Sequence, residues 1–291
     1  MNMGKHAVAE ELLNDAMALN PTDPNTHFVL VAINLLGLGV AYGPKGGKRV
    51  LDRILPVIEN FVFTNKLPGI SIATNLGSAY ILLQLPGKFD KLCERVVVDA
   101  ETPNGYSYSH LGSAFASWAT LYMKSESTGR AKSLFERALG FFDKANGPNE
   151  AGVAVVLGHL GALLQASNKY DRAKVLLERA LSIEEKLFTP VDARVADTLE
   201  KLGSVYGKLE LHSKAIDCFQ RAIEIHEKLL GANHVQVANA LCSLSSMLEA
   251  TKNFDGCIQL LSRARDIFEL AGDEDKVAEM SLRIVAAELG K

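Results

Sequence analysis

The sequence predicts an all-α protein, an α-solenoid built from antiparallel helix pairs. An arginine recurs every 42 residues, at Arg137, Arg179, Arg221 and Arg263, and its neighbouring residues recur with it. A fixed period of this length is typical of one supersecondary unit stacked many times. Apolar residues at helical spacing mark two helices in each unit. The short connections between these helices indicate antiparallel neighbours.

The first helix of each unit, helix A, carries apolar or small residues at spacing i, i+3, i+4, i+7, which is one face of an α-helix. The groups are Phe115, Trp118, Ala119 and Tyr122; Leu157, Leu160, Gly161 and Leu164; Leu199, Leu202, Gly203 and Tyr206; and Leu241, Leu244, Ser245 and Leu248. The four groups share one period, so they predict four copies of the same helix.

The second helix, helix B, keeps small residues in phase with those of helix A. They are Ala131, Ala173, Ala215 and Cys257. Glycine inside a helix costs about 1 kcal/mol relative to alanine, so Gly161 and Gly203 need a compensating contact. We expect close approach of the two helices, with Gly203 facing Ala215.

These residues resemble the tetratricopeptide repeat, whose usual unit has 34 residues. The period of 42 resembles the kinesin light chain type, and so does the segment from Gly231 to Ala238, which lacks that type's proline. The resemblance is strong over 109–272. It implies a right-handed superhelix in which helices A line a concave groove and helices B cover the outside.

The predicted organisation has four parts. Residues 1–24 match helix B alone, as a partial repeat or an N-terminal cap, and we favour a fragment of a longer protein. Residues 25–108 form irregular repeats, because a turn at 87–90 would displace Arg95 from its slot. Residues 109–272 form the regular array, and residues 273–291 form a capping helix or a truncated repeat.

Composition and charge exclude several classes of function. A net charge of −3 lacks the basic footprint of a nucleic-acid binder, which disfavours an RNA-binding repeat protein. The uncharged stretch 67–87 contains Pro68 and Asn75 and follows the repeat, so membrane insertion is not expected. Four cysteines without a Cys-x-x-Cys pair predict free thiols in a reducing compartment, and we expect a cytoplasmic protein.

No motif predicts an enzyme. The segment 43–48 resembles a phosphate-binding loop, but Tyr42 and Arg49 replace the residues that the motif needs. His226 has no second histidine at zinc-ligand spacing, and no pattern predicts a cofactor or metal site. We expect the glycines in segment 43–48 to serve turns and packing.

The resemblance assigns candidate partner-binding residues to the groove by their phase on helix A. Most are small and polar, which suits hydrogen bonding to an extended peptide. They could equally be the solvated side of an ordinary helix. They are Asn75, Ser78, Ser117, Thr120, Lys124, His159, Asp197, Lys201, Ser204, Lys208, Asn239, Ser243 and Ser246.

Charge in this set concentrates at its centre. Lys201 and Lys208 are seven residues apart and share one helix face, and His159 occupies the slot of Lys201 one repeat earlier. With Asp197 at one end, they predict a modest basic strip that suits a segment with one or two acidic residues. Family members that bind acidic C-termini use Lys and Asn at set groove positions, and that full set is absent here.

The sequence therefore predicts a non-enzymatic scaffold or adaptor that binds a peptide segment or partner protein in the groove. The alternative is an accessory subunit or domain that makes a permanent contact in a larger enzyme or assembly. Neither the partner nor the oligomeric state follows from the sequence.

Overall fold

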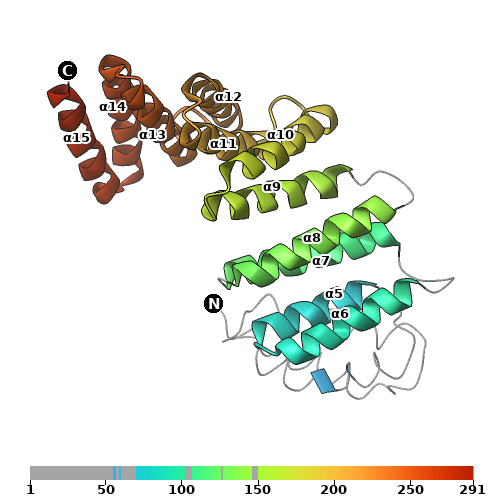
Figure 1. Cartoon of the computed structure of the whole chain (residues 1–291). Helices are drawn as coiled ribbons and strands as arrows, with labels where there is room; N and C mark the ends of the chain where they lie inside the picture. The colour runs from blue at the N-terminus through green and yellow to red at the C-terminus, as the bar shows by residue number, and fades with distance from the viewer. Residues whose placement is uncertain are drawn as a thin grey trace. The chain divides into compact units, whose positions relative to one another are not determined.

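The computed structural model describes residues 70–101, 107–125, 127–145 and 150–290, together with 55, 56 and 59. In these ranges the elements are eleven helices, α5 to α15, and no strand occurs (Figure 1). The partial repeat expected at 1–24 and the glycine-rich turn at 43–47 lie outside the described residues. Contacts divide the chain into two compact units, 1–149 and 150–291.

The described helices of the first unit form two antiparallel pairs, one formed by α5 and α6 and the other by α7 and α8, with α5 also packed on α7. The interface between the two pairs is aromatic. Trp118 and Phe115 are fully buried, and the Trp118 indole donates a hydrogen bond to the Thr74 carbonyl at 2.9 Å. The helices are α5 (Ile70–Leu82), α6 (Pro86–Ala100), α7 (Tyr108–Lys124) and α8 (Thr128–Lys144).

The second unit contains three helix pairs and a final helix, and each helix packs on the next along the chain. Its core is mainly aliphatic, with Leu177, Leu199 and Leu241 almost fully buried. The helices are α9 (Glu150–Ala166), α10 (Tyr170–Leu187), α11 (Ala193–Lys208), α12 (His212–Leu230), α13 (Val235–Ala250), α14 (Phe254–Ala271) and α15 (Glu274–Leu289). The order confirms the predicted solenoid of A and B helices.

The turn from helix A to helix B has the same backbone in both units. Its central residue has a positive φ of 55–60° at Gln84, Asn168, Glu210 and Lys252, which are all in phase with the 42-residue period. Residues other than glycine seldom adopt this conformation. The turn before α6 therefore lies at 83–85 rather than at the expected 87–90, so Arg95 keeps its regular slot.

The glycines of helix A allow close packing, but against a different residue from the one expected. A Cβ added at Gly203 would lie 3.0 Å from the Phe219 ring, and one at Gly161 would lie 2.6 Å from Leu177. Gly203 thus faces Phe219, one helical turn beyond Ala215. Ala215 is fully buried, as a small residue at an interhelix contact should be.

Candidate functional site

A cavity of about 330 Å³ lies between α11 and α13 in the second unit. Five of the groove residues predicted from the sequence line it. The other lining residues supply one carboxylate and an apolar wall. The lining consists of Glu200, Ser204, Gly207, Lys208, Phe219, Asn239, Ser243, Ser246 and Met247. This set is called the α11–α13 cavity.

Glycine shapes the floor and one wall of this cavity. Because Gly203 has no side chain, the Phe219 ring of α12 reaches past α11 and becomes part of the lining. A Cβ at Gly207 would lie 2.8 Å from the Met247 sulfur, so this glycine lets α13 approach α11. Both contacts involve residues that the groove-face pattern does not include, so the sequence analysis did not find them.

The hydroxyl groups around the cavity already have partners within the protein. Ser243 and Ser246 donate to carbonyls of their own helix at 3.2 Å. Ser204 accepts a hydrogen bond of 2.8 Å from the Gln165 amide of α9. These hydroxyl oxygens retain lone pairs, so the wall can accept hydrogen bonds from a ligand backbone.

The predicted basic strip carries less positive charge than its composition suggests. Lys201 forms an ion pair with Asp197 on the same helix. Burial, together with the nearby Lys201 charge, lowers the pKa of His159, so this imidazole is neutral at pH 7. Among the described residues Lys208 forms no ion pair, and its exposed ammonium lies at the cavity. Lys208 is therefore the available cation of the strip.

The carboxylate in the cavity wall belongs to a partly buried pair. Glu200 Oε1 lies 3.3 Å from Nε2 of His226, which is buried on α12. Burial raises the pKa of Glu200, and the neighbouring His226 opposes that shift. His226 Nδ1 is buried without a hydrogen-bond partner. The Glu200–His226 pair links α11 to α12, so the Glu200 carboxylate is not a free base in the cavity.

Among the described residues of the first unit, no cavity gathers the predicted groove residues as the α11–α13 cavity does. Ser117 and Thr120 donate hydrogen bonds to the carbonyls four residues earlier in α7. Ser78 does the same in α5 and is 7% exposed, so it presents little surface to a partner. Asn75 is half-buried on the same helix, and Lys124 lines a pocket.

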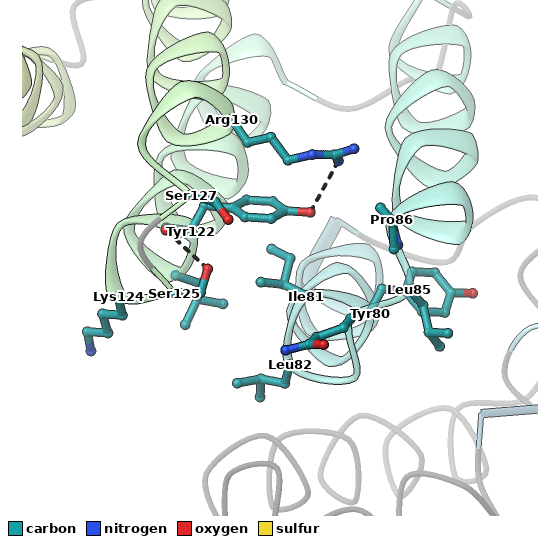
Figure 2. Close-up of a pocket in the computed structure, with 12 residues that line it drawn as sticks. Tyr80, Ile81, Leu82, Leu85, Pro86, Tyr122, Lys124, Ser125, Ser127 and Arg130 are labelled. Atoms are coloured by element: carbon teal, nitrogen blue, oxygen red, sulfur yellow. Dashed lines mark hydrogen bonds between the residues drawn. The ribbon is translucent and has the colours of Figure 1, made fainter.

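That pocket lies where two A-to-B turns of the first unit meet (Figure 2). Its volume is about 500 Å³, and Ile81, Leu82 and Leu85 form an apolar wall. Arg130 donates a long hydrogen bond of 3.5 Å to the Tyr122 hydroxyl at its edge. Helix ends and turn residues such as Gln84 and Ser125 build this pocket together, so the phase of one helix face does not predict it.

The described residues contain no group of three or more His, Cys, Asp or Glu side chains placed to hold a metal ion. None of the helices in the described part of the chain is long and apolar enough to cross a bilayer. The four thiols are free, and Cys93, Cys218 and Cys257 are buried. The α11–α13 cavity therefore offers a shaped surface with hydrogen-bond acceptors and the exposed cation Lys208.

Comparison with protein families identifies this architecture. The family model of the tetratricopeptide repeat matches residues 111–186 and 194–270, which is more than half of the chain. The chain therefore belongs to the tetratricopeptide repeat family, and its 42-residue period resembles that of the kinesin light chain type. No curated protein matches the chain.

Solved structures share the fold at low sequence identity. BtubC from P. vanneervenii is 18% identical, with a TM-score of 0.61 over 85% of this chain and 93% of its own. The apo form of RapI is 15% identical, with a TM-score of 0.65 over 95% of this chain and 75% of its own. A putative kinesin light chain from Podosopora anserina is 19% identical, with a TM-score of 0.52 over 67% and 92%. These similarities show the α-solenoid fold alone.

Proposed function

We propose that this protein is a non-enzymatic scaffold that binds an extended segment of a partner protein at the α11–α13 cavity. The observation that carries the proposal is the convergence of Ser204, Lys208, Asn239, Ser243 and Ser246 on one cavity. Side chains that could merely be the solvated side of two helices instead form a depression with polar walls. Its size suits part of a peptide rather than a whole domain.

The chemistry of the wall favours a peptide with some negative charge. Hydroxyl and amide oxygens accept hydrogen bonds from a peptide backbone, and Phe219 and Met247 give an apolar floor. Lys208 supplies a cation at the edge. The buried cysteine thiols suit a reducing compartment, so we place this function in the cytoplasm.

Selection from a phage-displayed library of random dodecapeptides tests this function. Peptides that bind the full chain should compete for one site, and the double variant Lys201→Glu with Lys208→Glu should lose them while keeping its helical circular dichroism. Both lysines lie on the groove side, so the substitutions should not unfold the protein. Retention of every selected peptide by the folded double variant would refute binding in this groove.

A permanent subunit contact is the second candidate, and it predicts a different result. A stoichiometric partner would co-purify from native lysate through washes with high salt, whereas a peptide-like partner should dissociate. Contacts to rim charges weaken as ionic strength rises, so the salt series separates the two functions.

A further inference from the structure

The last helix, α15, has one buried face and one exposed apolar face. Met280 and Ala287 are buried, and Val277 and Ile284 pack against the core beside them. On the opposite side, Leu282, Val285 and Leu289 are 73%, 51% and 85% exposed. Their spacing of three and four residues places them in one stripe along the helix, here called the α15 stripe.

Sequence register shows that the α15 stripe occupies groove positions. α14 begins 42 residues after α12, but α15 begins 39 residues after α13, because a shorter connection and a shorter helix precede it. An offset of 39 matches the inward residues of α13 with those of α15: Ala238, Leu241, Ser245 and Leu248 become Val277, Met280, Ile284 and Ala287.

The same offset converts polar groove residues into apolar ones. Asn239, Ser243, Ser246 and Ala250 of α13 correspond to Ala278, Leu282, Val285 and Leu289 of α15. The fold does not require apolar residues at Leu282 and Val285, since α13 carries Ser243 and Ser246 at the same positions, whereas Leu289 corresponds to Ala250. Three large exposed apolar side chains in one stripe indicate a surface that another molecule covers.

Contacts between α15 and α13 lie beside the α11–α13 cavity. Arg283, next to Leu282, donates hydrogen bonds of 3.0 Å to the hydroxyls of Ser245 and Ser246. Met280 accepts a contact of 3.2 Å from the Cys242 thiol. Ser246 lines the cavity, so a ligand that fills the cavity meets α15 at this edge.

Charge around this continuous surface favours an acidic ligand. Lys208 and Arg283 form no ion pair with any described residue. Two of the nearby carboxylates are engaged, because Glu200 pairs with His226 and Glu279 with Lys276 at 2.8 Å. Two cations without carboxylate partners border an apolar stripe.

We propose that the α15 stripe is a second subsite for the partner segment and takes two of its large apolar side chains, while an acidic residue of the segment lies at Lys208. This inference rests on the proposed function. Neighbouring helices lie about 8–10 Å apart, so two steps from α11 to α15 span about 20 Å. An extended chain rises about 3.3 Å per residue, so the acidic and apolar residues should lie about six positions apart.

The test uses the selected dodecapeptides as fluorescent probes and measures Kd by polarisation. Leu282→Gln with Leu289→Gln removes the stripe with little change in helix propensity. Leu270→Gln on α14, where the leucine is also 73% exposed, is the matched control. The stripe variant should weaken binding at least about tenfold, because it removes two apolar contacts, and the control should leave Kd unchanged.

The outcomes separate this inference from the function on which it rests. If Lys208→Glu weakens binding but the stripe variant does not, the cavity is the site and the α15 subsite is refuted. If no peptide binds, both proposals fail. If sedimentation shows a dimer of the parent chain that the stripe variant dissociates, the ligand of α15 is a second copy, which also overturns the proposal.

Discussion

Arg221 on α12 forms an ion pair with Glu185 on α10, and its Nη2 lies 2.6 Å from the carboxylate oxygen. One repeat later, Arg263 of α14 pairs in the same way with Glu227 of α12, at 2.5 Å. Both pairs join residues 36 apart, and both belong to helices B. At these two positions, the arginine that recurs with the period links successive repeats on the side of helices B, which is an architectural role.

These arginine pairs should contribute little to stability. Their side chains are about half exposed, and exposed ion pairs contribute about 0–1 kcal/mol because solvent and salt screen them. We expect Arg221→Met to lower the free energy of unfolding by less than about 1 kcal/mol in urea titrations, with a smaller effect at high salt. A loss of several kcal/mol would show that the pair is a cooperative part of the core.

Two helical glycines should respond to alanine in opposite directions. A methyl group at Gly161 would lie 2.6 Å from Leu177, and overpacking of this kind costs about 1–3 kcal/mol. Gly140 lies in α8 with open space around it, so Gly140→Ala should stabilise by about 0.5–1 kcal/mol. Thermal unfolding of both variants checks the signs, and a stable Gly161→Ala would contradict the close packing of α9 on α10.

The repeat pattern was sufficient to predict the helix pairs, because buried apolar and small residues recur with one period. It could not predict that Gly203 faces Phe219, since the contact depends on the crossing of two helices and not on phase. Nor could it predict the register of α15, because a shorter helix and a shorter connection together remove three residues from the period. The sequence placed Lys201 in a basic strip with Asp197 at one end, and the structure shows that these two side chains form an ion pair.

A buried glutamate should make stability depend on pH. Glu184 is 4% exposed, and its Oε2 has no hydrogen-bond partner. Burial raises the pKa of Glu184, so the folded state binds this proton more tightly than the unfolded state. Its contribution to stability is therefore largest at low pH, and falls as pH rises from the unfolded pKa, about 4.5, through the raised folded pKa.

The variant Glu184→Met tests this contribution. The slots 42 residues before and 84 residues after Glu184 hold Phe142 and Phe268, so the position accepts an apolar side chain. Removing a buried polar group that lacks a hydrogen-bond partner raises the free energy of unfolding by about 1–3 kcal/mol. We expect Glu184→Met to be more stable than the parent at pH 7.5, with a smaller gain at pH 4.5. A gain that grows as pH falls would show that the carboxylate stabilises the fold when ionised.

The cysteines should be slow to react while the protein is folded. Burial raises the pKa of Cys93 to about 12 and that of Cys218 to about 11, so almost no thiolate exists at pH 8. Reaction with Ellman's reagent should be slow for both residues, and fast for all four cysteines in guanidinium chloride. Rapid labelling of Cys93 in the folded protein, located by peptide mapping, would show that α6 opens readily.

The two groove lysines should differ in their effects on binding, although they share a helix face. Lys208 is exposed at the cavity without an ion pair among the described residues, whereas Lys201 is held by Asp197. Reversing the charge of Lys208 removes an available attraction for an acidic ligand and adds a repulsion. Reversing Lys201 mainly places a carboxylate four residues from Asp197, which destabilises the helix by a few tenths of a kcal/mol.

Kd and thermal stability, measured on the same variants, separate these effects. Lys208→Glu should raise the Kd of the selected peptides about tenfold or more with an unchanged melting temperature, because the loss of a charge-assisted contact is worth about 1.5–3 kcal/mol. Lys201→Glu should lower the melting temperature and raise Kd less. Lys228→Glu, an exposed position on α12, controls for net charge. A larger loss of binding with Lys201→Glu would mean that the ligand displaces Asp197 from Lys201, and that the centre of the site lies nearer α9 than the cavity indicates.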